Sequence, residues 1–310
     1  MNQPLPNTLQ EAIQYFADPQ RCLDFVVALR WPHGPTCPRC ASHDYRFIKT
    51  RSMWECKGCK KHYSVKVGTI FEDSPIQLDK WLCAIWMIVN AKNGVSSYEI
   101  ARSLGLTQKT TWFMMHRIRL ALQQGSLDRK LMGEVEVDET YIGGKARNMH
   151  RDKQEAKLRS EGTFRKAVVV GMLERKGHVR AEVVNRASAK LLQEAIKKHV
   201  IPGSQLYTDE LNSYVGMKKE YAHKVINHAE SYVKGSVHTN SIENFWSLLK
   251  RGIKGTYVSI EPFHLFRYLD EQSFRFNTRK DNDQERFLEA LASINGRRVQ
   301  YRELIGQTTF

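Results

Sequence analysis

The stretch from Glu134 to Thr140 reads EVEVDET, in which two valines alternate with acidic residues. An alternation with a period of two residues predicts a β-strand with one apolar and one polar face. Val135 and Val137 lie on the apolar face of this strand, and Asp138 lies on the other. The sequence therefore predicts a strand that presents an aspartate on the face opposite the two valines.

Apolar segments further along the chain extend this strand into a larger unit. Additional strands are predicted over residues 167–172, 179–184 and 205–207. Helical periodicity predicts helices over residues 191–200, 241–253, 262–277 and 284–294. Strands and helices that mix in this way predict the α/β fold class for the second half of the chain.

Two more acidic residues and a lysine follow Asp138 at positions that suit a common site. Asp209 ends a predicted strand, and Glu243 lies on a predicted helix. Lys250 comes seven residues, or two helical turns, after Glu243, so both lie on the same side of that helix. Clustered carboxylates repel one another and raise each other's pKa values. Divalent cations resolve this repulsion and suit phosphoryl transfer, so the pattern favours a metal site.

Each of these residues also has an ordinary interpretation. An isolated aspartate in a strand is usually a solvated or turn residue. Glu243 comes three residues after Asn240, which is the spacing of a capping box at a helix start. Lys250 alone would be a solvated lysine. The combination of the three acids and the lysine favours a site over these separate interpretations.

Four of the six cysteines form two close pairs, Cys37 with Cys40 and Cys56 with Cys59, separated by 15 residues. Two such pairs at this separation are typical of a four-thiolate zinc site on a ribbon of short strands, and Gly58 suits a tight turn. The alternatives are two disulfides, or four free thiols that bind no metal. Because four protein ligands leave no open coordination position, we expect the Zn²⁺ to be structural.

Residues 95–120 have the pattern of two helices joined by a turn. Gly105 suits the turn, and Thr107 suits the N-cap of the second helix. In a helix-turn-helix the second helix enters the major groove of DNA. The residues predicted to contact DNA are Gln108, Lys109, Thr111 and Arg117, with Lys254 as a further candidate. A helical hairpin that only supports a neighbouring element is the alternative.

The composition favours a partner with many negative charges. The 310 residues include 48 Lys and Arg against 33 Asp and Glu, which gives a net charge of +15. Basic proteins bind nucleic acid because counterions are released from the phosphate backbone. The longest apolar run, Trp81–Val89, is far shorter than the roughly 20 residues that span a bilayer. Without a signal-peptide pattern, the chain is expected to be cytoplasmic and to have no membrane partner.

Three segments together resemble a known family. Residues 135–145, 207–210 and above all 237–252, which read VHTNSIENFWSLLKRG, are similar to DDE transposases of bacterial insertion sequences with an N-terminal zinc ribbon. Residues 268–279 also fit. The resemblance implies a ribonuclease H-like mixed sheet core preceded by a zinc ribbon and a helix-turn-helix. The implied boundaries are 1–75 for the N-terminal helix and ribbon, 76–125 for the helix-turn-helix, 126–280 for the catalytic domain, and 281–310 for a C-terminal helix and tail.

The resemblance also implies an activity and the residues that perform it. Asp138, Asp209 and Glu243 would hold two Mg²⁺ ions, and Lys250 would hold the DNA end in register. Asn240 is a second candidate for the third acidic position, and His238 belongs to the similar segment without an assigned role. One Mg²⁺ would activate water to cleave at the element's end, and the other would stabilise the leaving oxygen.

The freed 3′-hydroxyl would then attack target DNA. This exchange of phosphodiesters needs no nucleotide cofactor, and the sequence has no GxxxxGK(S/T) loop. The implied partners are terminal inverted repeats, target DNA and at least one further copy of the chain, at the nucleoid. Two alternatives remain: a ribonuclease H-like nuclease or resolvase without strand transfer, and a DNA-binding regulator with an inactive core.

Overall fold

The computed structural model describes residues 4–123, 129–143, 166–209, 214, 216–217, 220–226, 238–258 and 260–305. For residues 209, 225 and 226 it describes the backbone alone. The chain divides into two compact units: Met1–Gly125 with Thr278–Phe310, and Ser126–Asn277. Within the described ranges, no helix combines the length and the apolar character needed to cross a membrane.

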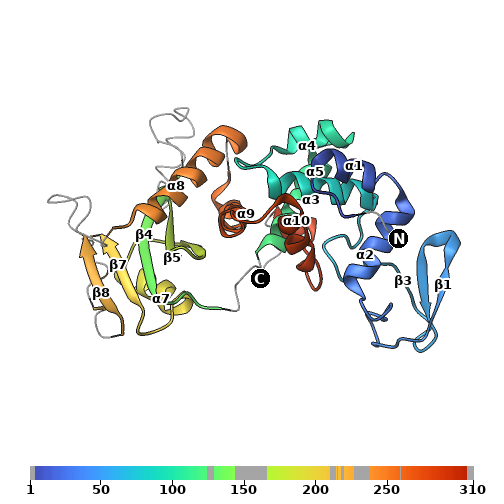
Figure 1. The fold of residues 1–310 in the computed structure, drawn as a ribbon, viewed down its shortest axis with the longest axis horizontal. Coiled ribbons are helices and arrows are strands. Elements are labelled where there is room, and N and C mark those ends of the chain that lie inside the picture. Colours follow the sequence, from blue (N-terminus) through green and yellow to red (C-terminus); the bar gives the residue numbers. More distant parts are fainter. Residues whose placement is uncertain are drawn as a thin grey trace. The chain divides into compact units, whose positions relative to one another are not determined.

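The first unit is mostly helical and includes one small sheet (Figure 1). Its helices are α1 (Leu9–Tyr15), α2 (Pro19–Arg30), α3 (Leu78–Asn90), α4 (Ser97–Leu104), α5 (Gln108–Leu122), α10 (Asp283–Ala292) and α11 (Tyr301–Leu304). Its three-stranded antiparallel sheet has the order β1 (Tyr45–Ile48), β2 (Met53–Cys56), β3 (His62–Tyr63), with the 3₁₀ turn η1 (Lys49–Arg51) between β1 and β2.

Helix α3 forms the centre of this unit. Its apolar side chains are buried almost all round, and Trp81 and Trp86 are each 1% exposed. Phe287 of α10 packs against Trp86 with ring centroids 5.0 Å apart. Helix α10 begins with a capping box between Asn282 and Glu285. The C-terminal segment therefore completes the core around α3.

Helices α4 and α5 are joined by the turn that the sequence predicts. Gly105 ends α4 in the left-handed conformation, with φ 61°, which glycine adopts without steric cost. Thr107 is the N-cap of α5, and its hydroxyl accepts a hydrogen bond from the Thr110 N–H at 3.2 Å. Both local predictions are confirmed.

The second unit is a mixed α/β structure. Its strands are β4 (Glu134–Ile142), β5 (Ala167–Glu174), β6 (Val179–Val184), β7 (Gln205–Asp209) and β8 (Ala222–Ile226). Its helical segments are α7 (Ala189–His199), α8 (Asn240–Gly252), the π-helical turn η5 (Ile253–Tyr257), the 3₁₀ turn η6 (Pro262–His264) and α9 (Leu265–Asn277). The strand order is β6-β5-β4-β7-β8. The three strands β4, β5 and β6 are antiparallel, while β7 and β8 continue the sheet in parallel with β4.

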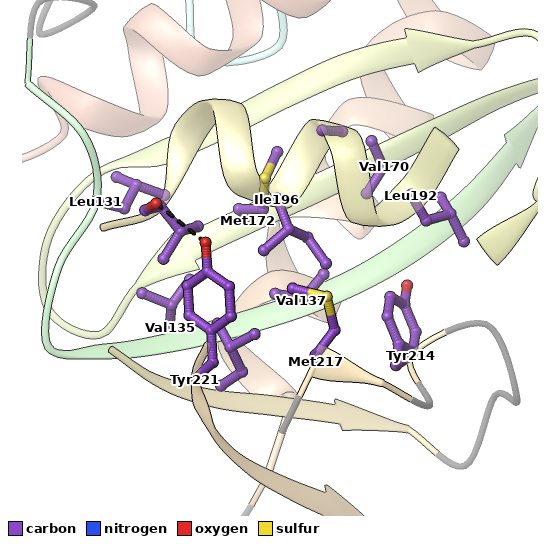
Figure 2. Packing of buried hydrophobic residues seen from close by; sticks show 13 residues of the cluster. Leu131, Val135, Val137, Val170, Met172, Leu192, Ile196, Tyr214, Met217 and Tyr221 are labelled. Atoms are coloured by element: carbon purple, nitrogen blue, oxygen red, sulfur yellow. Dashed lines mark hydrogen bonds between the residues drawn. The ribbon is translucent and has the colours of Figure 1, made fainter. Parts of the chain in front are cut away.

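Each face of this sheet packs against its own helices. Val135 and Val137 belong to a buried cluster with Leu192 and Ile196 of α7. Figure 2 shows this cluster, together with the hydrogen bond from the Tyr221 hydroxyl to the Val200 carbonyl. A second buried cluster joins the sheet to α8 and α9, and its members include Val169, Leu173, Ile242, Trp246 and Leu269. The predicted alternation along β4 is therefore confirmed, with its valines packed toward α7.

Candidate active site and metal centre

The candidate active site is built around Asp138 in the middle of β4, the central strand of the sheet. The Asp138 side chain is half-buried. Its Oδ1 accepts a hydrogen bond from the Glu139 backbone N–H at 2.8 Å, and its Oδ2 accepts one from Trp246 Nε1 at 2.9 Å. The carboxylate is therefore held from its own strand and from α8.

Asp209 lies at the corresponding place on the neighbouring strand. Strands β4 and β7 are parallel, and their last registered pair is Glu136 with Tyr207. Asp138 and Asp209 each come two residues after that pair, and Asp209 is the last residue of β7. The sheet backbone thus brings the two aspartates to equivalent positions; the side chain of Asp209 lies outside the described part of the structure.

Glu243 occupies the first turn of α8 and is exposed. It accepts a hydrogen bond from the Thr239 hydroxyl at 3.1 Å. The N-cap of α8 is Thr239, so Asn240 is the first helical residue and does not form a capping box with Glu243. The capping interpretation of Glu243 is therefore wrong in the form that the spacing suggested.

The start of α8 is capped instead by Glu136, a residue that the sequence analysis did not single out. Glu136 is completely buried on β4. Its Oε2 accepts hydrogen bonds from the backbone N–H groups of Ser241 at 2.9 Å and Ile242 at 3.0 Å. A carboxylate at a helix N-terminus satisfies unpaired N–H groups and interacts favourably with the helix dipole.

The other oxygen of Glu136 faces positive groups. Arg175 Nε donates to Oε1 at 3.0 Å, and Arg175 Nη2 donates to the His238 carbonyl at 2.8 Å. His238 Nδ1 lies 3.4 Å from the same Oε1, within ion-pair range when the ring is protonated. This network gives His238 a position beside the cap. The only sequence signal for the network was an acid two residues before Asp138 on the same face of a strand.

Lys250 and Lys254 have different local settings. Lys250 is half-buried in the last turn of α8, two turns after Glu243. Lys254 is exposed in the π-helical turn η5, where the chain no longer has 3.6 residues per turn. Lys254 therefore does not continue the α-helical face of Glu243 and Lys250, because the α-helix ends at Gly252.

The four paired cysteines come together in the first unit, as predicted. Their Sγ atoms all lie within 4.8 Å of one another. The Cys37–Cys59 and Cys40–Cys56 sulfur pairs are 3.7 and 3.5 Å apart. Four sulfurs at about 2.3 Å from a tetrahedral Zn²⁺ would be about 3.8 Å apart. The cluster therefore fits a zinc ion.

The two cysteine turns share one backbone conformation. The residue after each second cysteine has positive φ: Ala41 at 57° and Lys60 at 59°. Gly58, which the sequence suggested for the tight turn, is not the left-handed residue of its turn. The backbone N–H of Cys59 points at Cys56 Sγ across 3.5 Å, and together with the Cys40 thiol and the Gly58 N–H it lowers the pKa of the Cys56 thiol to about 6. A thiol that ionises readily suits a metal ligand.

The residues predicted to contact DNA separate into two groups. Lys109 is exposed on the first turn of α5, and Gln108 is half-buried, with its amide donating to the Ser97 hydroxyl at 3.0 Å. Thr111 is completely buried, and its hydroxyl donates to the Thr107 carbonyl at 3.0 Å. Arg117 is 3% exposed and donates to the Glu72 carbonyl.

Thr111 and Arg117 therefore belong to the interior of the first unit, and their assignment as DNA contacts is wrong. The physical reason is the packing of α5. Its third and fourth turns are buried around most of the helix, so only its N-terminal end keeps an exposed polar face.

Comparison with known proteins agrees with this arrangement. A family described as the ISXO2-like transposase domain matches residues 130–277, and a family described as the transposase zinc-ribbon domain matches residues 18–62. A transposase-like protein of Haemophilus influenzae is 34% identical over 110 residues, which is 35% of this chain and 88% of that protein. The chain belongs to the ISXO2-like transposase family.

A second relative matches a larger part of the chain. A protein in the transposable element ISH50 of Halobacterium salinarum is 24% identical over 255 residues, which is 77% of this chain and 84% of that protein. The transposase domain match covers the whole sheet together with α8 and α9. The zinc-ribbon match includes all four clustered cysteines.

Proposed function

We propose that this transposase-family protein binds the ends of an insertion sequence and catalyses Mg²⁺-dependent cleavage and strand transfer into target DNA. The observation that carries the proposal is the attachment of α8, the helix of Glu243, to β4, the strand of Asp138. Trp246 and Glu136 make this attachment through hydrogen bonds of 2.9 to 3.0 Å. It fixes the two acids relative to one another.

The sheet supports the assignment of a ribonuclease H-like core. The first three strands in chain order are antiparallel, and the last two join the free edge of the first strand in parallel. In open α/β sheets, ligands bind beyond the carboxyl ends of parallel strands where the strand order reverses. Asp209 ends β7 at such a place, beside β4.

The proposed site holds carboxylate oxygens, which are the ligands that Mg²⁺ prefers. Asp138, Asp209 and Glu243 would hold two Mg²⁺ ions, which supply activation of the attacking oxygen and stabilisation of the leaving oxygen. The chain's own contribution is to orient these carboxylates from three separate elements. Glu136 is not a further candidate ligand, because its oxygens already bond to Arg175 and to the start of α8.

The first unit supplies the proposed DNA-end recognition. The zinc ribbon and the α4–α5 helix pair, read as a helix-turn-helix, would bind the terminal inverted repeats through exposed residues such as Lys109. If each protomer processes one end, joining both ends of an element needs at least two copies. Chromosomal DNA as substrate would place the protein at the nucleoid.

The decisive experiment compares wild type with Asp138→Asn on labelled element ends in Mg²⁺. We expect the variant to bind the ends as wild type does and to lose cleavage and strand transfer, with Glu194→Gln on α7 as an active control. Appreciable cleavage by Asp138→Asn would overturn the proposal. If wild type cleaves the ends but never joins them, a simple nuclease is favoured. If wild type does not cleave and binds DNA equally well with and without Mg²⁺, a regulator is favoured.

A paired test assigns the third acid. Glu243→Gln should lose cleavage, whereas Asn240→Ala should keep it, because protein sites bind Mg²⁺ mainly through carboxylates and position 240 carries an amide. If Asn240→Ala loses cleavage and Glu243→Gln keeps it, Asn240 is the third metal ligand.

A further inference from the structure

The indole of Trp246 makes a contact with Asp138 that the family resemblance did not assign. Nε1 on α8 donates to Oδ2 on β4 at 2.9 Å, across 108 residues of sequence. Trp246 is 4% exposed. It is also the single tryptophan in residues 126–277, since the other five lie at positions up to 112. The contact is therefore part-buried, and its donor is the one tryptophan in the sequence of the second unit.

Gly171 makes room for this indole. It lies on β5 directly opposite Asp138 in the antiparallel register. A Cβ at position 171 would lie 2.5 and 2.6 Å from two carbons of the Trp246 ring and 2.9 Å from the Ile242 side chain. Contacts that short are sterically forbidden, so any larger residue at 171 would displace the indole from Asp138.

The chemistry of the donor suits a carboxylate that must bind a cation. An indole N–H donates only, so it cannot compete with the carboxylate for a metal ion. It carries no charge, so unlike a lysine or arginine it does not itself neutralise the negative charge of Asp138. A carboxylate has about four acceptor positions, so the hydrogen bond on Oδ2 is compatible with a cation on the same group.

The bond also couples two of the proposed ligands. Trp246 comes three residues after Glu243 on α8, and Asp138 comes two residues after Glu136 on β4. The helix is therefore tied to the strand twice, by the Ser241 and Ile242 N–H groups to Glu136 and by Trp246 to Asp138. Two attachments fix both the position of α8 and its rotation about its own axis.

We infer that Trp246 is a positioning residue that orients the Asp138 carboxylate for a divalent cation, and that Gly171 is its required counterpart. This inference rests on the proposed function for the identity of the bound cation. Groups that hydrogen-bond to metal ligands orient them, and their loss typically costs about 10- to 100-fold in metal affinity or activity.

The first test uses nuclear magnetic resonance and needs no catalysis. The ¹⁵N–H indole resonance of Trp246 in the full chain is assigned by its loss in Trp246→Phe. We expect Asp138→Asn to shift this resonance and to leave the other indole resonances in place. We also expect Mn²⁺ to broaden the Trp246 resonance before the other five. The inference would be overturned if Asp138→Asn did not shift the Trp246 indole resonance and Mn²⁺ did not broaden it.

The second test measures how cleavage depends on Mg²⁺ concentration. Trp246→Phe keeps an aromatic ring and removes the donor, so we expect it to need about 10- to 100-fold more Mg²⁺, or to cleave that much more slowly, with end binding intact. Phe245→Leu, a change of similar packing volume on the same helix, should keep the wild-type Mg²⁺ dependence. If Phe245→Leu shows the same defect, the effect is one of packing and the inference fails.

Gly171→Ala provides an independent route to the same defect, because its methyl group displaces the indole without removing it. We expect the double variant Gly171→Ala with Trp246→Phe to be no worse than Trp246→Phe alone, since both act on one interaction. Fully additive losses would contradict the assignment. Wild-type Mg²⁺ dependence in Trp246→Phe, beside an inactive Asp138→Asn, would reject this inference and leave the proposed function standing.

Discussion

The carboxylate of Glu136 accepts a hydrogen bond from the backbone N–H of Ser241 at 2.9 Å, although the two residues are 105 positions apart. Glu136 lies on the central strand, and Ser241 lies in the first turn of α8. A side chain of the sheet therefore caps the helix that carries Glu243. This cap makes the stability of the second unit and the geometry of its candidate site depend on one buried acid.

The first prediction concerns that acid. Glu136→Gln replaces one carboxylate oxygen by an NH₂ group. This group cannot accept a hydrogen bond from the Arg175 guanidinium or from the backbone N–H groups at the start of α8. Because this weakens the cap of α8 and removes one charged partner of the half-buried Arg175, we expect the free energy of unfolding of the second unit to fall by about 2–4 kcal/mol. Hydrogen exchange of the β4 and β5 amides measures this change.

The matched control for Glu136→Gln is Glu194→Gln on α7. The Glu194 side chain is 57% exposed, and it lies 4.0 Å from Lys190. An exposed pair of this kind contributes little, so the control should change the stability by less than about 0.5 kcal/mol. Equal effects of the two substitutions would show that the buried cap is not a major source of stability.

The second prediction is a pH dependence that originates at Glu182. His199 Nε2 lies 2.8 Å from Glu182 Oε2, and Lys198 contacts both oxygens at 3.0 Å. The hydrogen bond with His199, followed by that with Lys198, lowers the pKa of Glu182 from 4.5 to about 2. A lowered pKa in the folded state stabilises the fold above pH 4.5, and this contribution disappears as the pH falls toward 2.

Glu182→Gln should therefore destabilise the second unit near pH 7 and have little effect near pH 2. Since Glu182 is about one-third exposed, solvent screening limits the loss to about 1 kcal/mol. Unfolding free energies of wild type and variant, measured by hydrogen exchange at pH 7 and pH 3, should differ less at the lower pH. A constant difference across this range would count against the assignment.

The third prediction concerns zinc. Cys56→Ser should remove the metal and unfold the ribbon, because small units of this kind derive their folding energy from the metal. Cys83→Ala changes a buried thiol outside the cluster and should keep the zinc. Elemental analysis should find about one zinc per chain in wild type and in Cys83→Ala, and little in Cys56→Ser. Less than about half an equivalent in wild type never exposed to chelator would exclude a resident zinc.

The fourth prediction separates exposed from buried basic residues on α5. Lys109 is exposed, with its Nζ 5.1 Å from the centre of the Tyr301 ring. As one phosphate contact, Lys109→Ala should weaken binding to element ends and reduce the salt slope of binding by about one unit. Arg117→Ala should instead lower the melting temperature, because its guanidinium is buried against Trp81 and the Glu72 carbonyl. A lowered salt slope without a stability loss in Arg117→Ala would reverse this assignment.

The fifth prediction concerns Lys250, whose position two turns after Glu243 suits a phosphate beside the scissile bond. Lys250→Ala should weaken strand transfer of precut ends and should keep Mn²⁺ binding, because the acids remain. Lys190→Ala, whose side chain is 84% exposed on α7, should transfer as wild type does. Wild-type transfer by Lys250→Ala would make Lys250 an ordinary surface lysine. Lys254→Ala tests whether the exposed lysine of η5 also contacts DNA.

The sequence by itself determined those features that depend on local spacing. The alternation around Val135 and Val137 identified the central strand, and the spacing of the cysteines identified the four-cysteine cluster. Gly105 and Thr107 marked the turn between α4 and α5. Such features could be predicted because periodicity, capping and ligand spacing involve residues within a few positions of one another.

Only the tertiary structure decided which side chains meet across long distances. The sequence pointed to Asn240 as the partner of Glu243, whereas the fold caps α8 with Glu136 from a strand about 100 residues earlier. It also places the Trp246 indole on Asp138 and buries Thr111 and Arg117. The physical reason is that a hydrogen bond or a buried face depends on which elements pack together, and local periodicity does not specify that packing.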